Sequence, residues 1–184
     1  MKIGIISDTH NLIRPETAAA LTGCDAILHG GDISRQEILD ELSKIDPVYV
    51  VRGNNDKEWA EHIPWSLDFE LAGLRIYMTH KKKDLPEDLS PYDLVVYGHS
   101  HKYDLKEPAE GEAGPVLLNP GSCGPRRFGQ PITLAVAEIE EVQDPADESA
   151  GDPNGKGGAS AKPKITIYQI DIPHPAPRHS ANNA

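Results

Sequence analysis

The stretch "VYVVRGNNDKEW", Val48 to Trp59, is the key to the fold of this chain. Its apolar run, Val48 to Val51, has the length and the β-branched content of a buried strand. The run stops abruptly at "GNND", residues 53–56, a composition typical of a turn. Polar side chains directly after a buried strand are also what a binding site at the edge of a parallel sheet requires. The rest of the sequence favours the second interpretation.

The N-terminal third of the chain predicts a parallel βαβαβ unit, because short apolar runs alternate with helical segments. Pro15 is well placed to begin the first helix. Ser34 and Glu37 have the spacing of a capping box for the second helix. The predicted strands are Lys2–Ser7, Asp25–His29 and Pro47–Val51, and the predicted helices are Pro15–Leu21 and Ser34 to about Lys44.

The pattern then changes to strands that predict a second sheet packed on the first. Two strand-like runs joined by Ala72-Gly73 predict a hairpin. The predicted strands are Ser66–Leu71, Leu74–Thr79, Asp93–Tyr97, Val116–Asn119, Ile132–Glu140 and Lys164–Ile172. The fold class is therefore α/β, with two sheets and helices on the outside. We expect one domain over residues 1–184, with a flexible hairpin insertion at 143–163 and a disordered tail at 173–184.

Charge and composition exclude several classes of function. The 184 residues include 29 acidic and 18 Lys/Arg residues, for a formal charge of -11. General nucleic-acid binding needs a basic footprint, and so does docking on an anionic membrane. The N-terminus "MKIGIISDTH" lacks a signal-peptide pattern, and no apolar run is long enough to span a bilayer. Two cysteines, Cys24 and Cys123, make a disulfide framework improbable, so we expect a cytoplasmic protein.

Side chains that bind metals follow almost every predicted strand. They are carboxylate, imidazole and amide groups without a thiolate, which suits Mn²⁺, Fe²⁺ or Zn²⁺ better than Ca²⁺ or Mg²⁺. Seven candidates are too many for one ion and fit two ions that share one carboxylate. The candidates are Asp8, His10, Asp32, Asn54, His80, His99 and His101.

Each of these motifs alone has an ordinary explanation. Asp-x-His after a strand is often a turn with a surface histidine, and Gly-Asp is often only a turn. Gly-His-Ser-His, at residues 98–101, is a stronger metal signal. The argument rests on order and position, because all the motifs directly follow predicted strands.

With these motifs the sequence resembles the calcineurin-like metallophosphoesterase superfamily, and within it the small YfcE-type phosphodiesterases. The shared motifs are Asp8-Thr9-His10, Gly31-Asp32, Gly53-Asn54-Asn55-Asp56, His80 and Gly98-His99-Ser100-His101, and the Asn119–Ser122 stretch "NPGS" also matches. The resemblance covers roughly Met1 to Glu140 and the last strand. It implies a four-layer αββα sandwich with a dinuclear metal site at its edge.

The resemblance also implies roles for the seven ligands. Asp8, His10 and His101 would hold one ion, Asn54, His80 and His99 the other, and Asp32 would bridge them. A bridging water or hydroxide would be the nucleophile, and Asp56 would orient the loop. We predict Mn²⁺ in both positions, with Fe²⁺, Zn²⁺ and Ni²⁺ as alternatives.

The predicted catalytic residues are Asp32, Asn54, Asn55, Asp56 and His99, and the predicted substrate contacts are Asn11 and Asn55. Many phosphatases of the superfamily have histidine at the position of Asn55, where it protonates the leaving group or contacts the phosphate. Asparagine cannot act as a general acid near neutral pH. The sequence therefore predicts a phosphodiesterase that acts best on activated esters.

Several alternatives stay open. Lys81 stands where the family commonly has glycine and lies either near the substrate or in a solvated charge run. Trp59 and Trp65 either line a substrate cleft or pack in the core. The function could instead be that of a phosphomonoesterase or nucleotidase, or of a non-catalytic metal-binding scaffold. We expect a small phosphate ester as the partner, and the possibility of a homo-oligomer is open.

Overall fold

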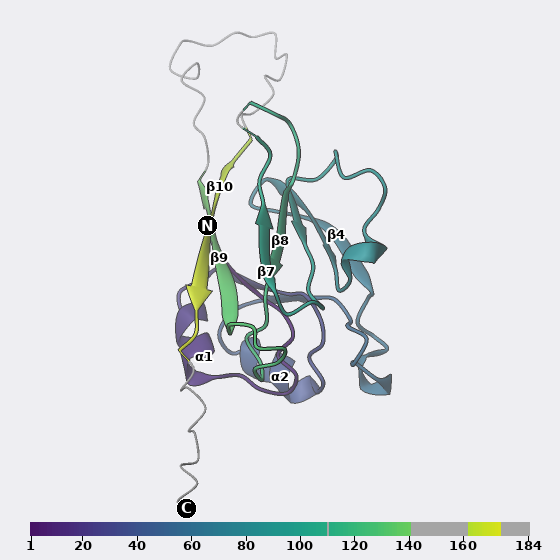
Figure 1. Cartoon of the computed structure of the whole chain (residues 1–184), viewed down its shortest axis with the longest axis vertical. Coiled ribbons are helices and arrows are strands. Elements are labelled where there is room, and N and C mark those ends of the chain that lie inside the picture. Colours follow the sequence, from purple (N-terminus) through teal and green to yellow (C-terminus); the bar gives the residue numbers. More distant parts are fainter. Residues whose placement is uncertain (110, 141–161, 174–184) are drawn as a thin grey trace, which may run out of the picture.

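Two β-sheets packed face to face form the framework of the protein (Figure 1). The computed structural model describes residues 1–109, 111–140 and 162–173, and in these ranges each sheet has five strands. Both sheets are mixed, because each contains parallel and antiparallel pairs of neighbouring strands. This arrangement confirms the predicted α/β sandwich.

The first sheet contains the βαβαβ unit predicted from the N-terminal third. Its strands β1 (Lys2–Ile6), β2 (Ala26–His29) and β3 (Val48–Val50) are parallel. The long antiparallel pair β9 (Thr133–Glu140) and β10 (Lys164–Asp171) extends the sheet on the β1 side, in the order β10-β9-β1-β2-β3. Helices α1 (Pro15–Leu21) and α2 (Gln36–Leu42) connect the parallel strands.

The second sheet has the order β4-β5-β6-β8-β7. The predicted hairpin forms its edge as β4 (Ser66–Leu71) and β5 (Leu74–Thr79). The other strands are β6 (Leu94–Val96), β7 (Tyr103–Lys106) and β8 (Val116–Pro120), and β6 runs parallel to both β5 and β8. Two 3₁₀ turns, η1 (Glu58–Ala60) and η2 (Lys82–Asp84), lie in the loops.

Alternation along the strands divides the core into two apolar layers. One face of β1, with Ile3 and Ile5, packs against Ile76 and Met78 of β5 between the sheets. The opposite face packs against the helices, where Ile6 joins the apolar side chains Leu21, Ile38, Leu39 and Leu42. The two sheets are thus joined by buried aliphatic groups, and both described α-helices cover the outer face of the first sheet.

The structure also corrects some details of the sequence analysis. Strand β7 was not predicted. Ser34 does not cap α2: the N-cap residue is Arg35, and the Ser34 backbone N–H donates to Asp56 instead. The outer face of the second sheet is covered by loop residues such as Tyr92, whose ring packs at a tilt against Tyr77, and not by an α-helix of the described residues.

Some expectations fall on parts of the chain outside the described residues. These are the flexible insertion at 143–163, apart from Lys162 and Pro163, and the disordered tail at 173–184, apart from Pro173. The single domain over 1–184 stays a prediction. Among the described helices, none is long and apolar enough to cross a lipid bilayer.

Candidate functional site

The loops that follow five parallel strands meet at one edge of the two sheets. β1, β2 and β3 contribute from the first sheet, and β5 and β6 contribute from the second. Two glycines allow this close approach. A Cβ atom at Gly53 would collide with the backbone of Asp32, and one at Gly98 would collide with the hydroxyl of Ser7. The sequence places polar residues after each strand, and the fold collects them.

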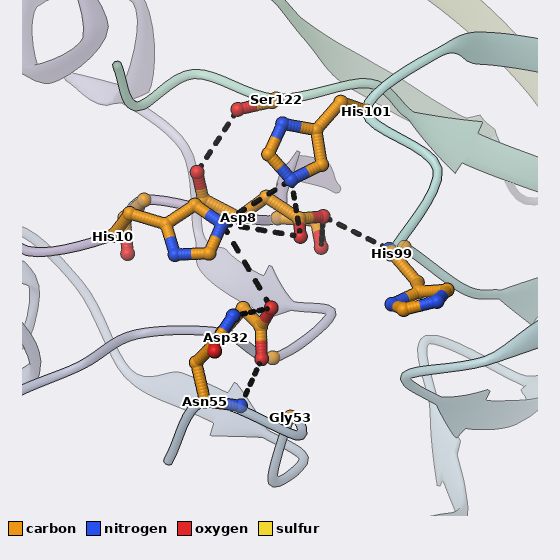
Figure 2. Close-up of polar contacts among 12 residues, drawn as sticks. Asp8, His10, Asp32, Gly53, Asn55, His99, His101 and Ser122 are labelled. Atoms are coloured by element: carbon orange, nitrogen blue, oxygen red, sulfur yellow. Dashed lines mark hydrogen bonds and ion pairs between the residues drawn. The ribbon is translucent and has the colours of Figure 1, made fainter. Parts of the chain in front are cut away.

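The first group of potential metal donors consists of Asp8, His10 and His101 (Figure 2). Asp8 Oδ1 lies 3.2 Å from His101 Nε2 and 3.7 Å from His10 Nε2. The two Nε2 atoms are 3.2 Å apart. Two nitrogens bound to one ion at 2.0–2.1 Å with tetrahedral angles would be separated by about 3.3 Å. The three side chains therefore converge at a spacing suited to one ion.

The second group consists of Asp32, His80 and His99. Asp32 Oδ2 lies 3.4 Å from His80 Nε2, and the same oxygen lies 3.8 Å from His10 Nε2 of the first group. The His80 and His99 rings meet edge to face with centroids 5.2 Å apart. Asp32 thus stands between the two groups, which is the position the resemblance implies for a bridging ligand.

Unpaired buried atoms in both groups fit bound cations. Among the described residues, Asp8 Oδ1 and His80 Nε2 are buried and have no hydrogen-bond partner. The other atoms of these side chains are fully engaged: Asp8 Oδ2 accepts from Ser7 Oγ and the His99 backbone N–H, and His80 Nδ1 donates to the Gly30 carbonyl. This bond directs the Nε2 lone pair of neutral His80 into the site, as in many metal-binding histidines. An unpaired buried polar atom is costly, and an ion would satisfy both.

Strained backbone conformations concentrate at the same place. Nine described residues other than glycine have positive φ, and five of them are candidate ligands: Asp8, His10, Asp32, His99 and His101. Each such residue costs about 1–3 kcal/mol. Strain of this kind is kept where function requires it, which supports a functional role for these loops.

Burial and neighbouring charges set the protonation of the donors. Burial lowers the pKa of His10, with a further contribution from Arg127, and burial and His80 lower the pKa of His99. Both imidazoles are therefore neutral at pH 7 and have a free lone pair. Burial opposes protonation of His80 too, but the Asp32 and Asp8 carboxylates outweigh it and raise its pKa.

Asp32 is held as a carboxylate by its contacts. Burial raises its pKa, but the His80 imidazole 3.4 Å away and the hydrogen bonds from Asn55 hold the pKa well below its usual range. The Asn55 backbone N–H donates to Asp32 Oδ1 at 2.8 Å, and Asn55 Nδ2 donates to Oδ2 at 2.7 Å. Asn55 thus clamps the carboxylate that lies between the two donor groups.

Asn54 and Asn11, two further predicted site residues, lie at the edge of the site. Asn54 is exposed and lines a cavity together with His80. Asn11 is exposed, and its backbone N–H donates to the Ile33 carbonyl. The structure brings both residues to the correct loops, and their contacts to an ion or a substrate stay predictions.

Asp56 has a larger structural role than its place in the motif indicates. Its side chain is 2% exposed and accepts hydrogen bonds from four backbone N–H groups at 2.7–3.0 Å. Three of these belong to residues 32–34 after β2, and the fourth belongs to Gly53 after β3. Asp56 therefore ties together the two loops that present Asp32 and Asn54.

Side chains of the "NPGS" stretch, residues 119–122, form hydrogen bonds with two loops of the site. Asn119 Nδ2 donates to the Gly98 carbonyl and to Ser100 Oγ, and Ser122 Oγ donates to the Asp8 carbonyl (Figure 2). These bonds fix the loop that carries His99 and the loop that carries Asp8. The sequence signal for this role was the motif itself, but its hydrogen-bond partners could not be read from it.

A cavity of about 340 Å³ opens beside the second donor group. Its lining includes Asn54, His80, Lys81 and Trp65. Lys81 is half-buried and lines this cavity, and its place near a substrate stays a prediction. The two tryptophans differ: Trp59 packs against the core, whereas Trp65 is 59% exposed at the cavity.

A fully buried histidine that the sequence analysis did not place in the site lies directly beneath it. His29 Nδ1 accepts from the Gly31 backbone N–H, so Nε2 carries the proton and donates to Thr9 Oγ1 at 3.0 Å. Burial lowers the pKa of His29 from 6.5 to about 4. This neutral imidazole joins the loop after β1 to the loop after β2.

The low pKa of His29 predicts a loss of stability in mild acid. The unfolded chain takes up a proton near pH 6.5, whereas the folded protein resists it down to about pH 4. Stability from this group is therefore complete above pH 6.5 and is lost as the pH falls. Between pH 7.5 and pH 5 the loss is about 2 kcal/mol in the free energy of unfolding.

Urea unfolding of metal-free protein at the two pH values measures this loss. The pKa values of His10 and His99 are lowered too, so the matched variant His29→Gln isolates the contribution of His29. We expect a smaller drop in that variant. An equal drop in both proteins would contradict the assignment.

Comparisons with known proteins agree with this geometry. The calcineurin-like phosphoesterase superfamily domain matches residues 1–142. A probable metallophosphoesterase of Methanothermobacter thermautotrophicus is 32% identical over 150 residues, covering 74% of this chain and 85% of the relative. A phosphodiesterase of Methanocaldococcus jannaschii is 26% identical and covers 78% and 96% of the two chains.

Solved structures show the same fold at lower identity. YfcE, a phosphoesterase from E. coli, aligns with a TM-score of 0.57 at 22% identity and covers 74% of this chain and 87% of its own. Vacuolar protein sorting 29 from Cryptosporidium parvum aligns with a TM-score of 0.62 at 17% identity and covers 93% and 98%. The match over residues 1–142 and the 32% identical relative establish the family. The chain belongs to the calcineurin-like phosphoesterase superfamily.

Proposed function

We propose that the protein is a dinuclear metal-dependent phosphodiesterase. The observation that carries this proposal is the convergence of two donor groups, Asp8–His10–His101 and Asp32–His80–His99, with the Asp32 carboxylate between them. A single-ion site would need only one of these groups. A site made only for structure would not leave buried donor atoms unpaired.

We assign the following roles to the residues of the site. Asp8, His10 and His101 would hold one ion, and His80, His99 and Asn54 would hold the other, with Asp32 shared. Two such ions, when bound, would activate a water molecule and neutralise charge on the phosphoryl oxygens. Asn55 would fix the orientation of Asp32, and Asp56 would hold the loops that carry Asp32 and Asn54 in register.

The preference for diesters rests on Asn55. Its amide donates to Asp32, and an amide cannot supply a proton to a leaving group near neutral pH. The leaving group must therefore depart as a weak base, which favours activated diesters over alkyl monoesters. The Methanocaldococcus relative that is named a phosphodiesterase supports the same preference.

The nitrogen and oxygen donors support Mn²⁺, with Fe²⁺, Zn²⁺ and Ni²⁺ as alternatives. Zinc is bound in a structure of Vps29 from Entamoeba histolytica, which shares the fold. Cys24 and Cys123 are free and buried, which supports a reducing cytoplasm. The partner would be a small phosphate ester.

A metal panel assay on one aryl diester and the corresponding monoester tests the proposal. Elemental analysis of the purified protein should find two ions per chain. Chelation should abolish release of the aryl group, and Mn²⁺ should restore it, with faster turnover of the diester. Metal-loaded protein that releases no product from any diester would overturn the proposal.

Asn55→His should raise monoesterase activity relative to diesterase activity. An imidazole at this position can donate a proton, which is worth about 10²-fold or more for a poor leaving group. The ratio of kcat/KM values on the two esters measures the effect, and Asn55→Gln is the matched control without an acid. A ratio that does not change in the histidine variant would contradict the role of Asn55.

A scaffold role is the second candidate, because the Vps29 structures share the fold. The complete donor set favours catalysis. Full metal occupancy together with negligible turnover of diesters and monoesters would favour the scaffold.

A further inference from the structure

The lining of the cavity beside His80 combines two kinds of side chain. His80 and Asn54 are proposed metal ligands, and Lys81, which follows His80 in the sequence, adds a positive charge. Trp65 and Tyr77 add aromatic surface. A volume of about 340 Å³ is at the lower end of the range of small-molecule sites. The cavity therefore offers more than a place for a phosphate group.

Lys81 makes this cavity attractive to an anion. Its side chain is half-buried and lines the cavity together with His80. Lys81 thus adds positive charge beside the second donor group, in a protein with a formal charge of -11. An anionic phosphoryl group is favoured beside this positive charge.

Trp65 is held in place although it is exposed. The Arg52 guanidinium lies 4.8 Å from the centroid of its ring. Arg52 is itself fixed, because Nε donates to the Asp56 carbonyl and the NH2 group donates to the Lys57 carbonyl. Trp65 lines the cavity, and Arg52 is not among the described residues that do so. A fixed indole loses little entropy when a planar ligand stacks on it.

We propose that this cavity binds a planar aromatic substituent of the phosphate ester, of the nucleoside or aryl class, by stacking on Trp65 while Lys81 binds the phosphoryl group. This inference rests on the proposed function and names its substrate class. Asp84, which also lines the cavity, can accept hydrogen bonds from exocyclic amines of a base and disfavours a second phosphate group. The substrate is then a phosphate ester with one flanking aromatic group and no second phosphate group.

Adenosine 5′-monophosphate and ribose 5-phosphate form a matched pair of probes, because they differ only in the base. Their dissociation constants for the metal-loaded full-length protein can be measured by titration calorimetry, with phosphate release followed in parallel. Stacking of one base on an aromatic side chain is worth about 1–3 kcal/mol. We therefore expect the adenosine compound to bind about tenfold more tightly.

Variants of Trp65 and Lys81 test the stacking contact and the phosphate contact separately. Trp65→Leu should remove the tenfold difference between the probes, and Trp65→Phe should keep most of it. Lys81→Met should weaken both probes equally, by about tenfold, whereas Lys83→Met on the exposed turn η2 should change neither. Tyr168→Leu, which removes an exposed aromatic ring on β10, is the control for Trp65 and should leave the difference intact.

The outcomes distinguish this inference from the proposed function. Equal affinity of the wild-type protein for the two probes, together with normal diester hydrolysis, would overturn the aromatic subsite and leave the phosphoesterase intact. A difference that persists in Trp65→Leu would also overturn it. Absence of both metal-dependent hydrolysis and probe binding would instead count against the proposed function.

Discussion

Replacing Asp56 by alanine should lower the free energy of unfolding by about 4 kcal/mol. The substitution leaves four backbone N–H groups without their carboxylate acceptor, and the three at residues 32, 33 and 53 are buried. Hydrogen bonds to a charged group contribute about 1.5–3 kcal/mol each, and they are not additive when they share one acceptor. Urea unfolding of the metal-free protein measures the loss.

Two other variants make this prediction specific. Asp56→Asn keeps one oxygen acceptor and should lose about 2 kcal/mol, which gives a measurable value if the alanine variant does not fold. Glu61→Ala, at an exposed position in the same loop, should change stability by no more than about 0.5 kcal/mol. An Asp56→Ala protein within 1 kcal/mol of wild type would show that the loops are held by other contacts.

The loss should extend to the site, because Asp56 positions Asp32 and Gly53 directly. Diesterase activity of Asp56→Ala should fall even at temperatures where the variant is fully folded. Titration of the folded Asp56→Ala protein with metal ions then shows whether the loss of activity arises from weaker metal binding and not from unfolding. Folded Asp56→Ala protein with normal metal affinity would limit Asp56 to a role in stability.

Asp32→Asn should reduce kcat/KM on an activated diester by about a thousandfold. The amide has nearly the same volume, but it removes the negative charge that lies between His80 and His10. A loss of 10²–10³ follows the removal of one preorganised electrostatic contact, and loss of an ion adds to it. Elemental analysis should find about one ion per chain, against the two that we expect in the wild-type protein.

The matched control is Asp40→Asn on α2, an exposed carboxylate that accepts from Gln36 Nε2. This variant should keep wild-type activity and metal content. Thermal unfolding of both proteins shows that any loss in Asp32→Asn arises in the folded state. Retention of more than a tenth of wild-type activity by Asp32→Asn would rule out Asp32 as a shared ligand.

Local sequence patterns were sufficient to predict most of the strands and helices. Proline at the first position and the apolar spacing located Pro15–Leu21, and Ala72-Gly73 located the hairpin, because these signals act between neighbouring residues. β7 was missed because Tyr103–Lys106 is only four residues long, which is too short for its alternation of apolar and charged residues to stand out. Ser34 was misjudged as a cap because its backbone N–H donates to Asp56, 22 positions away.

The sequence by itself determined which kinds of potential metal-donor side chain the protein has. It also determined that these side chains follow the parallel strands. That information is local, since it lies in the order of apolar runs and polar residues along the chain. Only the tertiary structure decided which side chains share a site. His10 meets His101 across 91 positions, and Asn55 meets Asp32 across 23.

The dependence on tertiary packing also explains why the sequence left the places of Trp59, Trp65 and Lys81 open. Trp59 and Trp65 lie six positions apart in the sequence, yet one packs against the core and the other borders the cavity. Lys81 begins a run of three lysines, but its position beside His80 turns it into the cavity. Such contacts depend on how the two sheets pack together, and no pattern within one segment of the chain records that packing.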